Sequence, residues 1–335
     1  MLRSRYGSRI ITNFGDYIWS PITIATEQRK SMCGLAGIMY KDSRSTGLAP
    51  IGGELVKMLE TMVHRGHDSA GVTIAGEELD SDLLIRIWAD ESAPAEETIV
   101  RAKETVMRAG GAIVSADANE SFLRLTANYE GDVSALAEAL LQTPGVVLHS
   151  IGEASEVIKD VGTPVVMDER HGISRLSGTH GVGHVRMATE SKIDISHSHP
   201  FWAYPFTDVT VVHNGQLTNY HGMKREYESL GHHFQTGNDS ELIAVYLADK
   251  LAAGADLNSA LEASLDDLDG TFTYLVSTRD GIGYAKDRWS AKPLVLMETD
   301  SVVALASEEV ALRSVFTEEL DRTEPQEHEV MTWSA

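Results

Sequence analysis

Cysteine is nearly absent from this chain, because Cys33 is the single cysteine among its 335 residues. One thiol excludes intramolecular disulfides, cysteine-based zinc sites and cysteine-ligated iron–sulfur clusters. Basic residues are also scarce: 28 Lys and Arg stand against 50 Asp and Glu, for a net charge of −22. That charge argues against nucleic acid or an anionic membrane as the main partner, since both attract basic surfaces. No apolar run approaches the roughly 20 residues of a membrane helix, so we expect a soluble, cytoplasmic protein.

The composition is otherwise that of a folded protein. Hydrophobic residues make up 42% and charged residues 23%, which is typical of globular domains. The first 32 residues differ, because they carry Arg3, Arg5 and Arg9 but no acid before Asp16. They lack the apolar segment and cleavage site of a secretory signal. We interpret 1–32 as an extension or propeptide, or as a segment that is not translated, and 33–335 as the functional domain.

Short apolar runs and amphipathic stretches predict an α+β fold. Several strands, then helices, then several strands favour two sheets with helices packed on their outer faces. The expected strands of this domain are 33–40, 72–75, 209–215, 271–278, 281–287, 292–298, 301–307 and 327–333, and its expected helices are 55–62 and 241–254.

Residues 79–165 have a different pattern and are predicted to form an inserted module. A strand at 83–89 precedes a helix at 96–110 and two strands, 112–116 and 121–129, joined by a turn at 117–119. A second helix, for which Asp132 is the expected N-cap, and a last strand complete the order βαββαβ. That order is the ferredoxin-like arrangement.

Cys33 is the first candidate for chemistry. A lone cysteine in an apolar segment is usually a small buried hydrophobic residue. The order Met32-Cys33-Gly34 offers an alternative. If Cys33 becomes the first residue, its α-amine, with an ordinary pKa of about 7.7–8.0, can accept the thiol proton. One residue then supplies both nucleophile and base.

Other polar residues allow both structural and functional interpretations. Arg186 lies in a short extended segment and could form a surface ion pair or bind an anion. Asn214-Gly215 is typical of a tight hairpin turn, but an Asn amide beside a Gly N–H also suits an oxyanion. The acids of 238–241 could satisfy a helix N-terminus. His197 and His199 lack a convincing third ligand, so we predict no metal site.

Five motifs in one order resemble those of a known family. The chain resembles the class II glutamine amidotransferases, which are N-terminal-nucleophile hydrolases with a four-layer αββα fold. The motifs are CGLAGI (33–38), HRGHDSAG (64–71), GHVRMAT (183–189), HNGQLTNY (213–220) and NDSE (238–241), and 268–294 and 304–312 are also similar to that family. The resemblance is nearest to the stand-alone amidotransferase subunit of glutamate synthases, and N-methylglutamate synthase has a similar subunit.

The resemblance implies a role for each matching residue. Cys33 would attack the glutamine carboxamide, form a thioester and release ammonia, and its α-amine would move the proton. Asn214 and Gly215 would stabilise the oxyanion. Arg186 would bind the α-carboxylate of L-glutamine and Asp239 its α-ammonium group.

The resemblance adds a sixth residue, and this sequence also departs from the family's pattern, at Met187 among other positions. Arg65 resembles a loop arginine near the site, and we place it with the substrate-binding residues. Met187 departs from the pattern, because many relatives have an aromatic residue after the motif arginine.

The chain has no Rossmann glycine motif, no Walker motif and no residues left over for a flavin-binding barrel. We therefore expect no cofactor in this chain. FMN and an iron–sulfur cluster would be on a separate glutamate-synthase-like subunit that receives the ammonia in a hetero-oligomer. A catalytically silent regulatory subunit of the same fold remains open. A hydrolase of another amide is the third alternative, although Arg186 and Asp239 together favour a free amino acid.

Overall fold

The computed structural model describes residues 33–335 apart from 44–46, 77–78, 80, 189–192 and 318–320. The predicted extension 1–32 lies outside the described residues. Among the residues described, no helix has the length and apolar character that crossing a membrane requires.

Cys33 lies directly before the central strand of the larger of two core sheets. Within the described residues this sheet has seven strands, all paired antiparallel. Their order is β15 (Arg322–Thr323), β13 (Val295–Glu298), β14 (Val302–Ala306), β1 (Gly34–Tyr40), β8 (His180–Arg186), β2 (Ser69–Ala75) and β7 (Ser155–Val161).

The smaller core sheet carries Asn214 and Gly215. Its five strands in the described part of the chain are also antiparallel. Their order is β16 (Glu329–Ser334), β12 (Gly281–Lys286), β11 (Gly270–Ser277), β10 (Thr210–Leu217) and β9 (Phe201–Trp202).

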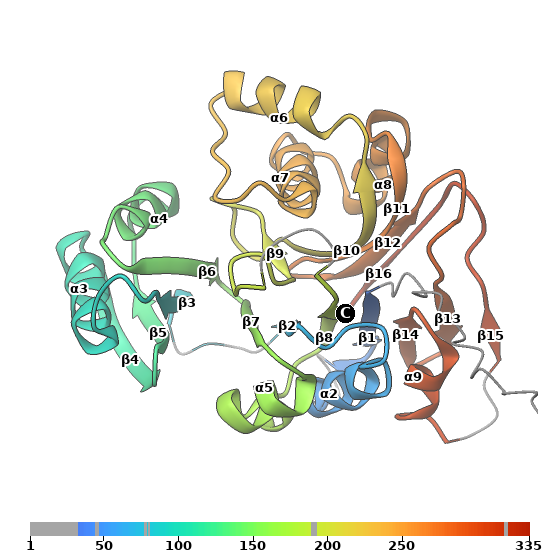
Figure 1. The fold of residues 1–335 in the computed structure, drawn as a ribbon, viewed down its shortest axis with the longest axis horizontal. Helices are drawn as coiled ribbons and strands as arrows, with labels where there is room; N and C mark the ends of the chain where they lie inside the picture. The colour runs from blue at the N-terminus through green and yellow to red at the C-terminus, as the bar shows by residue number, and fades with distance from the viewer. Residues whose placement is uncertain (1–32, 44–46, 77–78, 80, 189–192, 318–320) are drawn as a thin grey trace, which may run out of the picture. The chain divides into compact units, whose positions relative to one another are not determined.

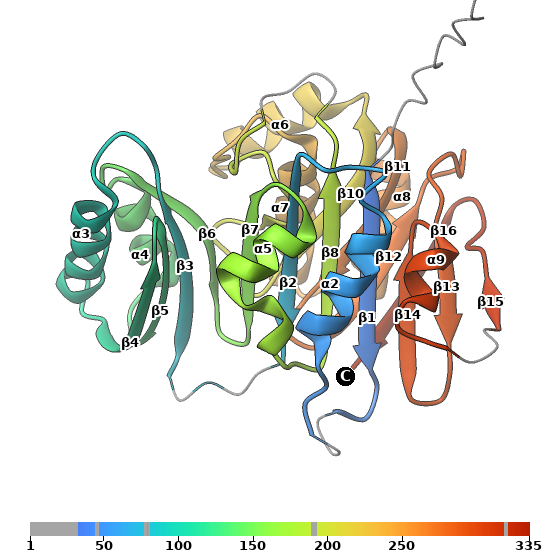
Figure 2. The same ribbon diagram turned by 60° about the horizontal axis from the view of Figure 1, so that its bottom comes forward.

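The two sheets pack face to face, and helices cover their outer faces (Figures 1 and 2). Side chains such as Leu35 and Met39 of β1 meet Val212 and Leu275 of the smaller sheet in a buried apolar layer. The helices beside the larger sheet are α2 (Ile51–Thr61), α5 (Pro164–His171), the 3₁₀ turn η1 (Ile173–Arg175) and α9 (Glu309–Arg313), and those beside the smaller sheet are α6 (Tyr220–Ser229), α7 (Asp239–Ala252) and α8 (Leu257–Asp267). The layers therefore follow the order αββα that was expected.

A third sheet lies within the range 79–165, which we call the module, and its four strands in the described part of the chain have the order β4-β5-β3-β6. Both helices of the module pack on it around one apolar cluster, since α3 and α4 contribute residues such as Ala102 and Leu136. Asp132 is the N-cap of α4, as predicted, and its side chain accepts a hydrogen bond from Ser134 N. The elements are β3 (Leu83–Ala89), α3 (Ala95–Arg108), β4 (Ala112–Asn119), β5 (Phe122–Asn128), α4 (Val133–Leu141) and β6 (Val146–Gly152).

Three details differ from the sequence predictions. The turn expected at 117–119 is part of β4, and Glu120, with φ of +51°, makes the turn one residue later. The range 79–165 also contains β7, which pairs with β2 in the larger core sheet rather than with the module. The closely spaced strands after 270 belong to two sheets. Strands β11 and β12 are in the smaller core sheet, and β13 and β14 are in the larger one.

Candidate active site

Cys33 lies directly before β1, where the larger sheet meets the end of β8. The register of β1 on β8 sets Gly34 opposite Val185, so Cys33 reaches the residues that follow Val185. The Met187 N–H donates a hydrogen bond to Cys33 Sγ over 3.4 Å, and Sγ lies 3.8 Å from the Met187 carbonyl oxygen. The sheet register therefore fixes the thiol beside the motif that contains Arg186.

The thiol needs a base before it can act as a nucleophile. Burial raises the pKa of the Cys33 thiol above its ordinary value, although the Met187 N–H and the Arg186 charge oppose this effect. The thiol is therefore protonated near neutral pH. Among the described residues, its hydrogen-bond partner is the Met187 backbone, which cannot accept that proton as a catalytic base.

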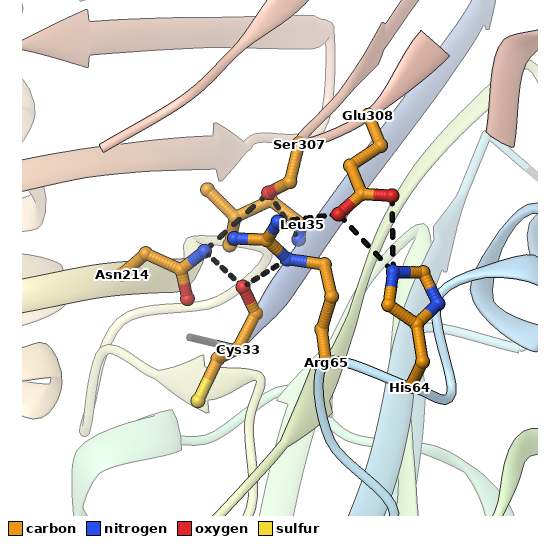
Figure 3. A network of polar contacts seen from close by, with 7 residues as sticks. All are labelled: Cys33, Leu35, His64, Arg65, Asn214, Ser307 and Glu308. Atoms are coloured by element: carbon orange, nitrogen blue, oxygen red, sulfur yellow. Dashed lines mark hydrogen bonds and ion pairs between the residues drawn. The ribbon is translucent and has the colours of Figure 1, made fainter. Parts of the chain in front are cut away.

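The carbonyl group of Cys33 is held from two sides (Figure 3). Asn214 Nδ2 donates to the Cys33 oxygen over 2.7 Å, and Arg65 Nε donates to it over 3.1 Å. Glu308 holds the Arg65 guanidinium through a 2.6 Å bond and also contacts His64 Nε2 at 3.1 Å. Arg65 therefore lies where it orients the backbone of Cys33.

Asn214 lies inside β10 and not in a turn. The strand continues through Asn214-Gly215 to Leu217, and Asn214 pairs with Thr273 of β11. The hairpin turn that the Asn-Gly pair also allowed is therefore wrong. Gly215 has φ of +146°, and a Cβ there would lie 2.0 Å from the Thr271 carbonyl oxygen, so this backbone requires glycine.

His184 orients the Asn214 amide. Its Nε2 lies 3.2 Å from Asn214 Oδ1. Burial, assisted by the nearby charges of Arg186 and His213, lowers the pKa of His184 to about 3, so the ring is neutral. Since Oδ1 can only accept, the neutral ring must donate from Nε2. This bond turns the amide so that Nδ2 points to Cys33.

Arg186 is the last residue of β8, and it is buried. A Cβ on Gly66 would lie 2.5 Å from the Arg186 carbonyl carbon, so the 64–71 loop packs directly on this backbone. The Arg186 charge favours the ionised forms of Cys33 and of Asp194. A cation therefore lies close to the Cys33 thiol, and a guanidinium is suited to bidentate binding of a carboxylate.

Asp239 is the first residue of α7, after the N-cap Asn238. Its Oδ2 accepts a hydrogen bond from Leu217 N over 2.9 Å, and its Oδ1 lies 3.6 Å from His213 Nδ1. Burial alone would raise the pKa of Asp239, but His213 and two backbone N–H groups outweigh it and lower the pKa. Asp239 is therefore a carboxylate at neutral pH.

Three histidines and a serine connect Asp239 with Asn214. Ser240 Oγ lies 2.9 Å from His199 Nε2 and 2.9 Å from His213 Nδ1. The His199 ring stacks on His184 with centroids 4.0 Å apart, and His184 contacts Asn214. We call His184, His199, His213 and Ser240 the histidine network.

Six residues of the site are predicted from the sequence, whereas the residues that hold these six in position are not. The structure brings Cys33, Asn214 and Arg65 into direct contact, and Gly215 follows Asn214 in β10. The sequence signal for the missed residues is their position, because His184, His213 and Ser240 lie inside the quoted motifs. Glu308 likewise lies within 304–312.

The remaining histidines take part in separate contacts. His197 Nδ1 lies 2.7 Å from Asp194 Oδ1, whereas His199 belongs to the histidine network. In the part of the chain that the structure describes, no three His, Cys, Asp or Glu residues are grouped to hold a metal ion.

Comparison with known proteins agrees with this geometry. A sequence-family model described as a glutamine amidotransferase domain matches residues 184–314. A Methanothermobacter thermautotrophicus protein, assigned by name to the glutamine amidotransferases, is 39% identical over 304 residues and covers 88% of this chain and 98% of its own. The chain belongs to the glutamine amidotransferase family. It is accordingly an enzyme of glutamine amide-nitrogen transfer.

Two further similarities extend this result. The glutamine amidotransferase-like protein GlxB of Rhizobium meliloti is 38% identical over 283 residues, which cover 84% of this chain and 91% of GlxB. The solved glutamine phosphoribosylpyrophosphate amidotransferase of B. subtilis superposes with a TM-score of 0.53 at 18% identity. It covers 90% of this chain, whereas this chain spans 47% of that enzyme. At this identity the superposition shows the fold alone, which is the N-terminal-nucleophile type.

Proposed function

We propose that the chain hydrolyses L-glutamine to glutamate and ammonia through a thioester on Cys33. The Cys33 sulfur attacks the carboxamide carbon, the C–N bond breaks, and ammonia leaves with the proton taken from the thiol. Water then cleaves the thioester, which releases glutamate and restores the thiol. The base is the α-amine of Cys33, which exists once Cys33 is the first residue of the mature chain.

The convergence of groups on Cys33 carries this proposal. Asn214 and Arg65 hold its carbonyl oxygen, and the Met187 N–H meets its sulfur. Asn214 Nδ2 has a second hydrogen, whose contact with Ser307 Oγ is long at 3.4 Å. That hydrogen, together with the Gly215 N–H, is suited to the oxyanion that forms beside the sulfur.

Arg186 and Asp239 would select a free amino acid. The buried Arg186 guanidinium binds the α-carboxylate of glutamine, and the Asp239 carboxylate binds its α-ammonium group. Their charges are opposite to those of the substrate groups, and Asp239 stays ionised because its pKa is lowered. An amide without these two charges would gain neither charge-assisted contact, which disfavours the hydrolysis of other amides.

The ammonia would be used by a separate subunit. We propose a flavin-containing, glutamate-synthase-like partner, which carries FMN and an iron–sulfur cluster, with the ferredoxin-like module as an insertion in the amidotransferase. Support comes from the single cysteine and from the absence of nucleotide-binding motifs in the sequence. The N-methylglutamate synthase type of partner fits the same residues.

A mass measurement combined with a glutaminase assay tests the reaction. Intact mass of the natively expressed protein gives its first residue, and glutamate release from L-glutamine gives the rate. We expect protein that begins at Cys33 to be active, and protein that retains 1–32 to be slower by about 10²–10⁴-fold because it lacks the amine base.

Cys33→Ser in the chain that begins at this residue is the matched control, because serine keeps the amine and removes the sulfur. We expect its rate to fall by on the order of 10⁴-fold with the fold unchanged. Equal rates with and without 1–32 would contradict the amine base. An inert protein that begins at Cys33, tested also with its synthase subunit, would favour the silent regulatory alternative.

A further inference from the structure

A cavity of about 460 Å³ lies between the inserted module and the core. On the module side it is lined from α4 and β6, and on the core side from β7, β9, the 233–236 segment and the first turn of α7 (Figure 1). Its volume is within the range of small-molecule sites, which often lie between domains. Its wall has a polar part and an apolar part, and the apolar part includes Leu141, Leu148, Phe201, Trp202, Tyr204 and Phe234.

A buried lysine is the cation in this wall. Lys159 is 6% exposed, and its Nζ donates to the carbonyl oxygens of Ser198 and Pro200 over 3.0 and 3.4 Å. It also lies 5.1 Å from the centroid of the Phe201 ring. Among the described residues, no carboxylate comes within ion-pair distance of Nζ, although a buried cation is normally paired. One of its three N–H groups remains for a ligand.

The carboxylates in the wall already have partners. Glu241 Oε1 accepts from Gln235 N over 2.6 Å, and its Oε2 accepts from Thr236 N and Thr236 Oγ1 over 2.8 and 2.5 Å. Glu138, on α4, accepts a 3.0 Å hydrogen bond from Gln142. Neither carboxylate forms an ion pair with Lys159, although the Glu241 charge acts on the lysine from a longer distance, so a direct charged contact with Nζ is left for a ligand.

We propose that this cavity binds a small carboxylate-bearing molecule with a flat apolar body, and that its binding changes the glutaminase rate. The carboxylate pairs with Lys159, and the apolar body packs among the aromatic side chains. The binding step is independent of the proposed function, whereas the effect on rate rests on it.

The structure contains a short connection from the cavity to the catalytic residues. Lys159 holds the carbonyl groups on either side of His199, namely those of Ser198 and Pro200. His199 contacts Ser240 and stacks on His184, which orients the Asn214 amide. A ligand that draws Lys159 toward its carboxylate weakens the carbonyl bonds and shifts His199.

The first turn of α7 is a second connection. Asp239 contacts His213 and Ser240 belongs to the histidine network, whereas the next residue, Glu241, lines the cavity. A movement of this turn therefore changes both sites together. Coupling between two sites is reciprocal in binding free energy, so a ligand in the cavity also changes the affinity for glutamine.

Calorimetric titration with phenylacetate tests the binding step, and phenylacetamide is the neutral probe of nearly the same shape. We expect phenylacetate to bind, and phenylacetamide to bind at least about tenfold more weakly because it cannot pair with Lys159. Lys159→Met removes the charge and keeps the length of the side chain, so it should weaken the binding of phenylacetate by a similar factor. Lys57→Met, at an exposed position of α2, is the matched control and should bind as the parent protein does.

Gln142→Trp is a second variant that leaves Lys159 in place. Gln142 is exposed and lines the cavity, so tryptophan there should fill the opening without disturbing the core. We expect phenylacetate binding to be lost. Absence of binding to the parent protein, equal affinity for both probes, or unchanged affinity in Lys159→Met and Gln142→Trp would overturn the site.

Glutamate release measured with and without phenylacetate tests the coupling. We expect a change of at least about twofold in kcat or KM in the parent protein, and none in Gln142→Trp. If calorimetry shows binding but the rate of glutamate release does not change, the proposed coupling is wrong and the proposed binding site stands. A protein that hydrolyses no glutamine but binds phenylacetate would contradict the proposed function alone.

Discussion

Two regions of the molecule bury different kinds of side chain. One is the space between the two core sheets, and the other is the junction between the module and the core. Between the sheets, residues such as Leu35, Val212 and Leu275 form an apolar layer. At the junction, Glu156 of β7 pairs with Arg86 of β3 at 2.5 Å and with Arg124 of β5 at 3.2 Å. Lys159 is buried on the same strand.

The two kinds of buried side chain have different effects on the structure. Apolar packing is dense and non-directional, so it fixes the distance between the sheets and brings Cys33 of one sheet to Asn214 of the other. Buried ion pairs are directional and add less net stability, because desolvation opposes the attraction. The junction charges therefore orient the module, and changes there should affect stability more than catalysis.

Asn214→Ala, in the space between the sheets, should produce a larger effect than any change at the junction, and that effect is on the rate. It removes one oxyanion donor, so we expect kcat to fall by about 10²–10³-fold, or roughly 2.7–4 kcal/mol of barrier. KM should change little, because the donor acts on the transition state. Steady-state kinetics of glutamate release measure both constants. A rise in KM with kcat unchanged would mean that Asn214 binds glutamine instead.

The same contrast explains what could be predicted from the sequence. The expected strand at 83–89 is β3 in full, because its apolar residues form a clear local pattern. Strand β7 was missed because its sequence, SEVIKDV, contains three charged residues that are nevertheless buried. Arg86, which pairs with Glu156, lies on β3 and is 70 residues away in the sequence, so no local pattern indicates this partner.

The candidate site shows the same limit. Motif residues such as Cys33 and Arg65 were predicted, and the structure places them in contact. The local sequence of Asn214-Gly215 allows either a turn or a strand. The strand forms because these residues pair with β11, which lies far along the chain. Ser307 and Glu308 contact Asn214 and Arg65 across the fold, so these roles could not be derived from local pattern.

Glu156→Gln should produce a smaller effect, and on stability. The change leaves Arg86 and Arg124 without their carboxylate in a buried position. We expect the free energy of unfolding to fall by about 2–3 kcal/mol, measured by urea denaturation. Glutamate release per folded molecule should stay within about twofold of the parent rate, since Glu156 lies outside the candidate site.

Glu120→Gln is the matched control for that change. Glu120 also pairs with an arginine, Arg170, at 3.3 Å, but its side chain is 66% exposed. Removing an exposed pair should cost less than about 0.5 kcal/mol. If both variants lose the same stability, the junction charges are no more important than surface charges, and the contrast between the two regions fails.

The pH dependence of that stability difference is the smallest effect and the sharpest test. Burial disfavours the Glu156 carboxylate, but Arg86 and Arg124 outweigh it and hold its pKa below the ordinary value of 4.5. A group whose pKa is lowered on folding contributes stability above its unfolded pKa and loses it as the pH falls. The difference in unfolding free energy between the parent protein and Glu156→Gln should therefore have its largest value at pH 7 and decrease below pH 4.5. Urea denaturation between pH 3.5 and 7 measures it, and a difference that stays constant over this range would show that the Glu156 carboxylate is not the source of the stability.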